Sequence, residues 1–383
     1  MTRGWAEKSI DEVAFVGRGK SRHRPRNEPA LYGGEHPFVQ TAEIHNSDLW
    51  ITTFSQTYND KGLAQSKMWE PGTICITNAG ENTGDSAILG IRACFPDSVI
   101  AVVPDPRKSD TIFLKYAIDR LKPRLRRVTR GATQDNLSVS KLTSFKFPTP
   151  PVDKQRKIGA VLRAYGDLIH NNRRRIQLLE QAARLLYKEW FVHLRFPGHE
   201  HVKIKDGVPE GWSKMRLGEL VEIRKGKNIT QAIAREGTIP VVAGGLEPAY
   251  YHNEANAAGP VVTISASGAN AGFVNIYHED IWASDCSYIS FEPTRYLYYY
   301  YCLLKSRQQE AFGLQKGSAQ PHVYPKDLMR LPAMTPTEKL LRCFTDAVAT
   351  SFALIKNLIS QNKSLRAARD VLLPRLMNGE VAV

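Results

Sequence analysis

A chain of 383 residues, of which 42% are hydrophobic and 23% charged, can bury two ordinary cores, and this composition excludes an intrinsically disordered protein. Its 52 Lys and Arg residues against 38 Asp and Glu residues give a formal net charge of +14, which predicts a polyanionic partner, nucleic acid above all. The five cysteines lie far apart and no apolar run reaches the ~20 residues that span a bilayer, so we expect a cytoplasmic protein with reduced core cysteines, no metal site and no membrane partner.

The sequence indicates a tandem duplication. Gly131–Gln134, followed by Leu142, return as Gly317–Gln320, followed by Leu328, at a step of about 185 residues, close to half of the chain. A period of this length is one domain plus one connector rather than a solenoid unit. A duplicated chain has two similar faces, so we expect a target or partner that also comes in two halves.

The first segment, residues 1–150, has the pattern of a mixed α/β domain. Its β-rich runs, such as Gly72–Thr77, alternate with Gly, Asn and Pro turns. The loop Asn78–Gly84 follows that run directly; its small residues allow close backbone approach and its Asn side chains can contact base edges, with a plain hairpin turn as the alternative. Basic clusters at Arg18–Arg26 and Lys122–Arg130 predict phosphate contacts, the alternative being a solvated surface.

Residues 151–196 predict one long helix. Two columns at seven-residue spacing carry apolar side chains at nine of ten positions, which is the pattern of a coiled-coil seam. No proline interrupts it before Pro197, so the helix should have about 35–40 residues and a length of roughly 55–60 Å. Its seam is expected at Ile158, Leu162, Tyr165, Ile169, Asn172, Ile176, Leu179 and Leu186, together with Ala183 and Trp190.

The second segment, residues 205–335, repeats the features of the first. A β-rich run at Pro260–Ser265 leads into another loop of small polar residues, Ser265–Gly272. Basic residues again lie nearby in the sequence, among them Lys225 and Lys316. The presence of the loop in both halves favours a functional loop over a plain turn.

Residues 336–383 predict a second long helix. Thr335–Glu338 has the sequence of a capping box with Pro at the first helical position. Pro374 removes an amide donor and Asn378-Gly379 form a stop signal, so the helix should end or kink near Leu373. One seam column is expected at Phe344, Ser351, Leu358, Leu365 and Leu372, and the other at Ala347, Leu354, Gln361 and Ala368.

The predicted fold class is α+β, with two mixed α/β domains alternating with two long helices. Because a helix with one apolar stripe is not stable alone in water, the two helices should pair as an antiparallel coiled coil. Asn172 would then be a polar seam residue that fixes the register. The alternative is that each helix packs on its own domain and leaves Asn172 at the surface.

The residues expected to contact DNA are basic side chains of the clusters and polar side chains of the loops and of the repeated segment. Basic residues position a protein on the phosphates, whereas a smaller polar set specifies the sequence. In the first half they are Arg18, Lys20, Arg22, Arg24, Arg26, Asn78, Asn82, Thr83, Arg126, Arg130 and Gln134. In the second half they are Lys225, Lys227, Asn228, Ser267, Asn270, Lys316 and Gln320.

A search for catalytic motifs assigns no catalytic residue. An adenine methyltransferase requires an Asn/Asp-Pro-Pro-Tyr/Phe motif, and the nearest string, Thr149–Val152, serves better as a helix entry. Asp105–Lys108 lacks the second carboxylate that a metal-dependent nuclease needs. The sequence has no P-loop, Gly-x-Ser-x-Gly or His-Glu-x-x-His motif.

Several segments, in their order along the chain, carry a likeness to a known family: Pro209–Trp212 with Leu217–Leu220, Gly317–Leu328, Leu331-Pro332 and the tail Leu372–Gly379. Over essentially its whole length the chain resembles the specificity subunit of type I restriction-modification systems. The resemblance implies that residues 1–150 and 205–335 are two target-recognition domains, each reading half of a bipartite site in double-stranded DNA. It also implies that the helices of 151–196 and 336–383 act as spacers that set the distance between the half-sites.

The same resemblance implies the partners and cofactors. The helices would dock two adenine-methyltransferase subunits and, through the complex, restriction subunits that form an ATP-driven motor. S-adenosylmethionine, ATP and Mg²⁺ would then be bound by those subunits and none by this chain, which would itself be non-catalytic. Two alternatives stay open: a diverged DNA methyltransferase or nuclease, and a coiled-coil architectural protein that binds DNA without sequence preference.

Overall fold

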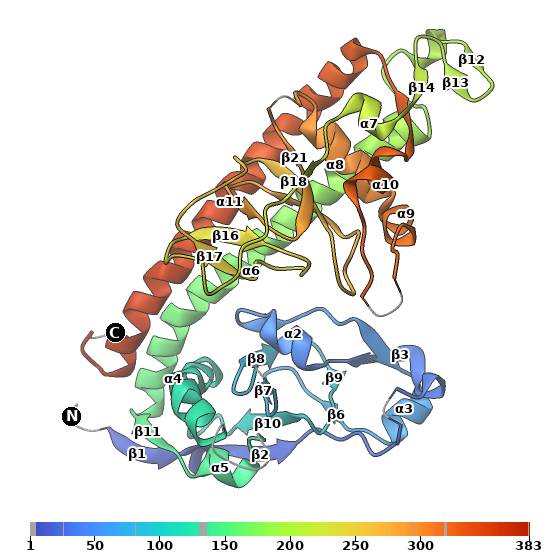
Figure 1. Ribbon diagram of the computed structural model, residues 1–383. Coiled ribbons are helices and arrows are strands. Elements are labelled where there is room, and N and C mark those ends of the chain that lie inside the picture. The colour runs from blue at the N-terminus through green and yellow to red at the C-terminus, as the bar shows by residue number, and fades with distance from the viewer. Residues whose placement is uncertain are drawn as a thin grey trace. The chain divides into compact units, whose positions relative to one another are not determined.

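The computed structural model describes residues 5–25, 27–80, 82–129, 136–292, 294–317, 320–381 and 383, and the predicted DNA contacts Arg26, Arg130 and Gln134 lie outside these ranges. The chain divides into two compact units: unit 1 is Met1–Arg174 with Ile359–Val383, and unit 2 is Arg175–Leu358. Each unit contains a mixed α/β domain and part of both long helices (Figure 1). Within the described ranges, no helix is long and apolar enough to cross a membrane.

Unit 1 is organised around a five-stranded sheet in the order β2-β10-β7-β8-β4. Side chains alternate between its faces and both faces are buried, with Ile74 and Ile76 of β7 in one core and Cys75 in another. Helices α4 (Thr111–Thr129) and α6 (Val152–Tyr187) contribute to the first of these cores. The strands of this sheet are β2 (Ala14–Arg18), β4 (Trp50–Ile51), β7 (Ile74–Thr77), β8 (Ser86–Leu89) and β10 (Val99–Pro104).

A second sheet of unit 1 has four strands in the order β5-β3-β9-β6. Its strands are β3 (Tyr32–Phe38), β5 (Gln56–Tyr58), β6 (Met68–Trp69) and β9 (Ala93–Cys94). The short helices of the unit are α1 (Ile10–Val13), α2 (Thr41–His45), α3 (Asp60–Ala64) and α5 (Val139–Thr143), with a 3₁₀ turn at Pro29–Leu31.

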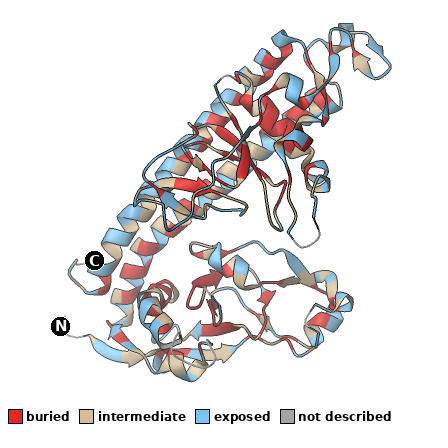
Figure 2. Cartoon of the chain, viewed as in Figure 1, coloured by how far each residue is buried: buried red, intermediate tan, exposed pale blue. Residues whose placement is uncertain are grey.

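Unit 2 has a four-stranded sheet in the order β15-β21-β18-β19 and a three-stranded sheet in the order β17-β16-β20. The central strand β18 (Val261–Ser265) is buried along its whole length, as its β-rich sequence predicts (Figure 2). The other strands of the two sheets are β15 (Arg224–Lys225), β16 (Ile239–Val242), β17 (Tyr250–His252), β19 (Val274–Tyr277), β20 (Trp282–Ala283) and β21 (Cys286–Ser290). The helices are α7 (Leu217–Leu220), α8 (Leu297–Ser306), α9 (Gln308–Gly313) and α10 (Pro325–Met329), and a β12–β13 hairpin (Ile204–Lys205, Val208–Pro209) follows a 3₁₀ turn at His199–His201.

The two units follow one plan, which confirms the duplication predicted from the sequence. In unit 1 the first strand, β1 (Ala6–Ser9), pairs with the strand that leads into the long helix, β11 (Lys146–Thr149). In unit 2 the corresponding strands β14 (Ser213–Arg216) and β22 (Pro332–Thr335) pair in the same antiparallel way. The strand order β2-β10-β7-β8 of the first unit likewise corresponds to β15-β21-β18-β19 of the second.

The two long helices are α6, of 36 residues, and α11 (Glu338–Met377), of 40 residues. In unit 1, Ile158 and Leu162 of α6 share a core with Leu376 of α11. In unit 2 the rings of Tyr187 and Phe344 lie 6.2 Å apart between centroids. An early residue of α6 therefore meets a late residue of α11, and a late residue of α6 meets an early residue of α11. This confirms the predicted antiparallel coiled coil.

The ends of the helices differ in detail from the prediction. Helix α6 passes into a π-helical turn at Lys188–Val192, and Leu194 has a φ of +59°, so the helix stops before Pro197. Helix α11 begins at Glu338 with the Thr337 hydroxyl as the acceptor for the Leu340 N–H (3.4 Å), whereas Thr335 belongs to β22.

Of the two predicted outcomes near Leu373, an end or a kink, the end is wrong, because α11 continues through Pro374 to Met377. It ends instead at the predicted Asn378-Gly379 signal. There Gly379 N donates to Leu376 O (3.0 Å) and Glu380 N donates to Arg375 O (2.8 Å), and Gly379 takes the left-handed conformation that this cap requires, with a φ of +68°.

One of the two predicted seam columns on α11 is displaced by one residue. In the first column Phe344 and Leu358 are buried and Leu365 and Leu372 are half-buried, and in the second column Leu354 is half-buried as well. In its column Ala347, Gln361 and Ala368 are exposed, and the buried positions are Val348, Ile355, Asn362 and Leu376. Steps of three and four residues both keep side chains on one helical face, so apolar spacing alone did not fix which neighbouring column faces the partner.

The residues predicted for the seam of α6 are all at least partly covered. Ile158, Leu162, Ile169 and Asn172 are buried, and Tyr165, Ile176, Leu179 and Leu186 are half-buried. Asn172 and Asn362 are 6% and 5% exposed, and the Asn172 amide donates to Asn362 Oδ1 (3.1 Å). A shifted pairing would leave these buried amides without each other, which supports the interpretation of Asn172 as a residue that fixes the register.

Four of the five cysteines are buried and unpaired: Cys75, Cys94, Cys286 and Cys302. Burial raises the pKa of the Cys75 and Cys286 thiols, so they behave as inert core residues. Cys343 is exposed on α11, and the prediction that all five lie in the core is wrong for this residue.

Candidate nucleic-acid interface

In unit 1 a tightly hydrogen-bonded loop connects β7 to β8. Gly84 N donates to Thr77 O (2.9 Å) and closes the loop, and Thr83 N donates to Gly80 O inside it (3.1 Å). Gly80 and Gly84 have φ values of +78° and +85°, a region that glycine occupies without steric cost. The small residues of the sequence are therefore required by the backbone of this loop.

Unit 2 contains the same loop after β18. Gly272 N donates to Ser265 O (2.8 Å) and Ala271 N donates to Gly268 O (3.0 Å). The φ values of Gly268 and Gly272 are +77° and +91°, close to those of the first loop. The loop is thus a built feature of both domains and not a coincidence of composition.

A Gly-Lys turn directly follows strand β2 in unit 1, at Gly19-Lys20, and strand β15 in unit 2, at Gly226-Lys227. Gly19 N donates to Val99 O (2.9 Å), and Gly226 N donates to Cys286 O (2.8 Å). A Cβ on either glycine would lie 2.2 Å from a backbone carbonyl oxygen, so only glycine fits. The same strand neighbours, β10 and β21, contact the strands from which the loops start.

The chain returns to each loop through its repeated segment. In unit 1 Leu137 N donates to Asn78 O (2.7 Å), and in unit 2 Val323 N donates to Ala266 O (2.9 Å). The structure therefore brings together three features in each unit: the polar loop, the Gly-Lys turn and the described part of the repeated segment, represented by Leu137 and Val323. This shared arrangement is the candidate nucleic-acid interface.

Two predicted DNA contacts in the first loop are corrected by the structure. Asn78 and Thr83 are buried: the Asn78 amide donates to Asp97 O (3.2 Å) and the Thr83 hydroxyl donates to Gly80 O (2.6 Å). Asn and Thr commonly satisfy the backbone of a turn in this way, so these side chains hold the loop and are not available to DNA in this conformation. Asn82 is half-buried.

Arg126 has a bracing role in the same loop. Its guanidinium donates to Thr83 O (3.0 Å) and lies 3.6 Å from the Asp85 carboxylate. Asp85 also forms ion pairs with Lys122 and His45. These contacts connect the loop to α4 and α2, so part of the second basic cluster stabilises the loop rather than facing solvent.

The first basic cluster is more accessible. Arg18 and Arg22 are exposed and Lys20 is half-buried. Arg24 is exposed and its guanidinium lies 3.4 Å from the Asp97 carboxylate. Exposed cations of this kind are the side chains with which DNA-binding proteins contact phosphates.

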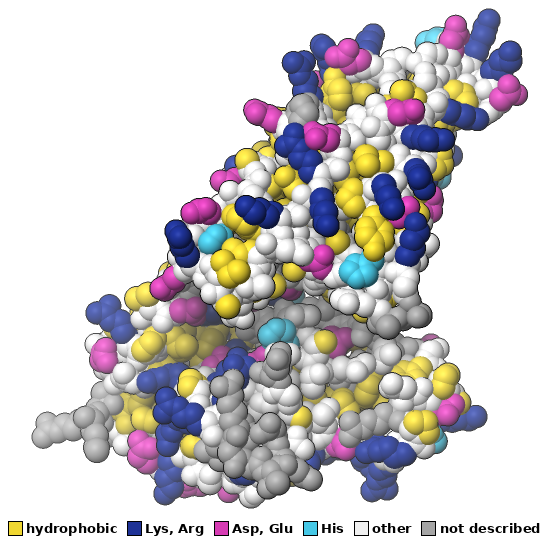
Figure 3. Space-filling view, viewed as in Figure 1, with side chains coloured by type: hydrophobic (Ala, Val, Ile, Leu, Met, Phe, Trp, Pro, Cys, Tyr) yellow, Lys and Arg dark blue, Asp and Glu magenta, His cyan; other side chains and the backbone are white. Residues whose placement is uncertain are grey.

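In unit 2 the predicted residues of the corresponding turn are also accessible. Lys225, Lys227 and Asn228 are exposed, and Asn270 is half-buried. The Lys227 ammonium lies 6.0 Å from the centroid of the Trp282 ring. Figure 3 shows Lys and Arg side chains on the visible face of both units, set among apolar side chains.

Other predicted residues of unit 2 have partners within the protein. The Ser267 hydroxyl donates to the Asp285 carboxylate. The Lys316 ammonium lies 2.8 Å from the Asp327 carboxylate and holds the pKa of Asp327 below its usual range. Gln320 is exposed.

Sequence reasoning missed two aromatic residues at this interface. His322 exchanges both backbone hydrogen bonds with Lys316 (2.9 Å each), and its ring stacks on Tyr324 with centroids 6.0 Å apart. Tyr324 is exposed. A search for aromatic residues beside the repeated segment, in addition to basic and polar ones, would have found both.

The described residues contain no group of three or more His, Cys, Asp or Glu side chains that could hold a metal ion. The interface is made of hydrogen-bond donors, cations and aromatic rings. This arrangement is suited to binding a polyanion by charge and by base or sugar contacts.

Comparisons with known proteins identify the family. The sequence model of the type I restriction modification DNA specificity domain matches residues 2–181 and 209–340. The chain is 24% identical over 414 residues to the type I restriction enzyme MjaIX specificity subunit of Methanocaldococcus jannaschii, covering all of this chain and 95% of that protein. It is 25% identical over 284 residues to the putative type I specificity subunit S.MgeORF438P of Mycoplasma genitalium, covering 71% of this chain and 72% of that protein.

The fold agrees with a solved relative. The crystal structure of a type I restriction-modification system S subunit from M. genitalium superimposes with a TM-score of 0.54 at 18% identity, over 98% of this chain and 96% of that one. Two matches of the family model, one starting in each α/β domain, follow the duplication seen in the structure. The chain belongs to the family of type I restriction-modification specificity subunits.

Proposed function

We propose that this chain is a non-catalytic subunit that directs a type I restriction-modification complex to a bipartite target in double-stranded DNA. Residues 1–150 and 205–335 would be the two target-recognition domains, each reading one half-site. The observation that carries the proposal is the repeated interface: the closing hydrogen bonds from Gly84 N to Thr77 O and from Gly272 N to Ser265 O are 2.9 and 2.8 Å. Two equivalent surfaces in one chain suit a target with two parts.

The exposed cations supply the sequence-independent part of binding. A net charge of +14 and the accessible Arg18, Arg22, Lys225 and Lys227 favour release of counterions from the phosphates. Three polar residues of the second domain are also accessible: Asn228 and Gln320 are exposed, and Asn270 is half-buried. These are the residues we assign to sequence reading in the second domain.

Replacing the two kinds of residue should give different results. Arg18→Ala with Arg22→Ala should weaken binding to cognate and random duplexes alike and make the slope of log K against log salt shallower by ~0.9 for each phosphate that the variant no longer neutralises. Asn270→Ala should weaken cognate binding by about 1–3 kcal/mol and leave random binding and the salt slope nearly unchanged. The measurement is a fluorescence anisotropy titration at several salt concentrations.

The alternative of an architectural protein makes a different prediction in the same titration. Such a protein would bind cognate and random duplexes with equal affinity, and Asn270→Ala would affect both equally or neither. That result would contradict the proposal that the loop reads the DNA sequence.

A second surface supports the docking of partner subunits. Leu178, Ala182 and Leu185 of α6 are exposed at i, i+4 and i+7, so they form one apolar helical face beside the seam. Large apolar side chains in this pattern are the usual anchor of a partner helix. We assign this face to a methyltransferase subunit; S-adenosylmethionine, ATP and Mg²⁺ belong to the methyltransferase and motor subunits in this proposal.

Charged residues on this face should block assembly. Leu178→Asp with Leu185→Asp should abolish copurification of the methyltransferase subunit, because a carboxylate cannot be buried in an apolar contact without a partner. Ile233→Asp is the matched control, since Ile233 is also exposed in unit 2 but lies off the helix. Copurification that survives the double substitution would assign docking to another surface.

A further inference from the structure

A short segment of unit 1, Asn46–Trp50, fastens the α/β domain to the long helices; we refer to it as the docking segment. It follows α2 and ends in β4. Leu49 is fully buried, and α6 has Gly166 at the point of contact. A Cβ at Gly166 would lie 2.4 Å from Leu49 Cδ2, so this approach depends on the absence of a side chain.

The next residue of the docking segment adds polar contacts to the same helix. The Trp50 indole N–H donates to the Asp167 carboxylate (2.6 Å), which also accepts from the Arg163 guanidinium (3.1 Å). The Arg163 guanidinium lies 5.5 Å from the centroid of the Trp50 ring. The indole is therefore held both by its N–H group and over its ring face.

Asp48 is the centre of the docking segment because it contacts both long helices. Its carboxylate lies 2.8 Å from the Arg173 guanidinium of α6 and accepts two hydrogen bonds, of 3.2 and 3.1 Å, from Arg366 of α11. The Asp48 side chain is only 16% exposed. A two-pronged contact from a planar guanidinium fixes direction as well as distance.

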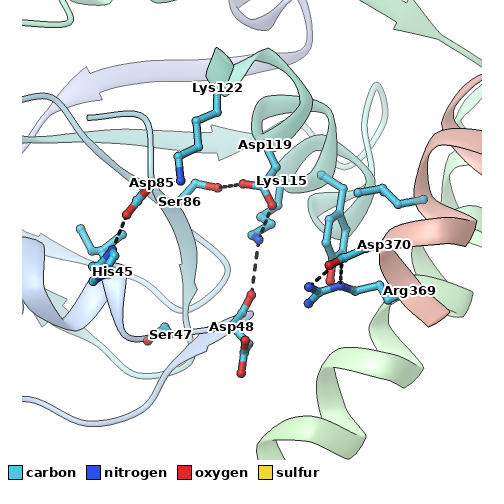
Figure 4. A pocket seen from close by; sticks show the side chains of 13 residues that line it. His45, Ser47, Asp48, Asp85, Ser86, Lys115, Asp119, Lys122, Arg369 and Asp370 are labelled. Carbon is cyan, nitrogen blue, oxygen red and sulfur yellow. Dashed lines mark hydrogen bonds and ion pairs between the residues drawn. The ribbon is translucent and has the colours of Figure 1, made fainter. Parts of the chain in front are cut away.

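The charges around Asp48 line a cavity of about 370 Å³ in unit 1 (Figure 4). The Lys115 ammonium donates to Asp48 O (3.4 Å) and lies 2.6 Å from the Asp119 carboxylate, and Asp119 accepts from the Ser86 hydroxyl (2.6 Å). Opposite charges of the lining are paired with one another. The cavity is therefore a polar contact region between the α/β domain and the long helices of unit 1.

The docking segment is also connected, through β8, to the loop of the nucleic-acid interface. Ile88 N donates to Leu49 O (2.8 Å), because β4 runs parallel to β8. Strand β8 begins immediately after the loop, and the Asp85 carboxylate at the end of the loop is paired with His45, which precedes the docking segment. A shift of the docking segment on the helices would thus carry the loop with it.

We propose that Asp48 is a positioning residue: through the docking segment it fixes the orientation of the first target-recognition domain on the paired helices and so determines which spacing between half-sites the protein accepts. This inference rests on the proposed function in that it requires a bipartite target. It goes beyond that function by assigning the tolerance for spacing to one ionic contact rather than to helix length alone.

The test uses the complete complex and the motif obtained from the methylated sites of the host. Binding is measured to duplexes with the native spacer and with one base pair added or removed. Asp48→Asn removes the charge but keeps the shape of the side chain, and it should reduce the preference for the native spacer about tenfold. A duplex that contains only the half-site of the second domain should be bound as by the wild type.

A second variant disturbs the same joint without changing charge. Gly166→Ala raises helix propensity but forces Leu49 to move, so it should also reduce the preference for the native spacer. The charge reversal Asp48→Arg with Arg366→Asp should recover part of the preference that Asp48→Arg alone removes. If Asp48→Asn unfolds the first domain, Gly166→Ala decides the question.

Glu70→Gln is the matched control. It removes the same charge from an exposed ion pair with Arg92 in the same unit, where the side chains are 68% and 66% exposed, and it should leave the preference unchanged. The proposal would be overturned if both Asp48→Asn and Gly166→Ala kept the wild-type preference for the native spacer. It would also be overturned if the variants lost as much affinity for the half-site of the second domain as for the full site. A wild-type complex that shows no sequence preference would instead overturn the proposed function, a result that the random duplexes reveal separately.

Discussion

Replacing residues 1–150 with the corresponding domain of another specificity subunit is expected to change one half of the methylated motif and leave the other half intact. The reason is that each domain carries its own loop, Gly-Lys turn and returning segment, and each of these sets lies within one unit. The exchange keeps the β1–β11 pair together, because both strands lie inside it. The motif is read from methylated adenines by sequencing the host DNA.

The contacts of the docking segment determine which residues this exchange must keep. The incoming domain should retain Asp48 and Leu49, since Arg173, Arg366 and Gly166 on the helices are shaped to receive them. A chimera that carries substitutions at these two positions serves as the comparison and should lose spacing preference as well as the old half-site. A change in both halves of the motif by the first chimera would contradict independent reading.

Adding one heptad to both long helices is expected to lengthen the spacer of the recognised motif by about three base pairs. Seven residues extend a helix by about 10 Å, and one base pair rises about 3.4 Å. Because α6 and α11 pair antiparallel, the insertions belong at facing positions, after Ile176 in α6 and before Leu358 in α11. Both points lie on the unit 2 side of the Asn172–Asn362 hydrogen bond, which is left in place.

A single insertion in α6 is the control for this experiment. It would shift the seam on one side of the insertion against an unchanged α11, and the buried residues there would lose their partners. We expect this variant to be destabilised and to lose specific binding. If the double insertion gives a functional protein whose motif keeps its original spacer, the helices do not set the distance between half-sites.

The elements with strong periodic patterns could be predicted from the sequence. The heptads of α6 predicted positions that are all buried or half-buried, and the β-rich runs predicted β7 and β18, which are buried throughout. The same reasoning misplaced one column of α11. Val348 and Ile355 lie one residue beyond Ala347 and Leu354, and only the contact with α6 distinguishes these neighbouring columns.

The candidate site was predicted at the level of segments but not of side chains. Composition indicated the loop after β7, yet the Thr83 hydroxyl donates to Gly80 O within the loop and the Asn78 amide donates to Asp97 O beside it, because polar side chains near a tight turn satisfy backbone carbonyl groups. Asp48 carries no local signal at all. Its importance depends on Arg173 and Arg366, which lie far from it in the sequence and meet it only in the folded protein.

The most direct measurement is the methylome of a host that expresses the methyltransferase partner with and without this chain. With the chain present, we expect methylated adenines at one motif made of two specific half-sites separated by a fixed spacer of unspecified bases. Without it, methylation at that motif should disappear. Methylation that is independent of this chain, or a motif without a spacer, would contradict its role as the subunit that reads a bipartite DNA target.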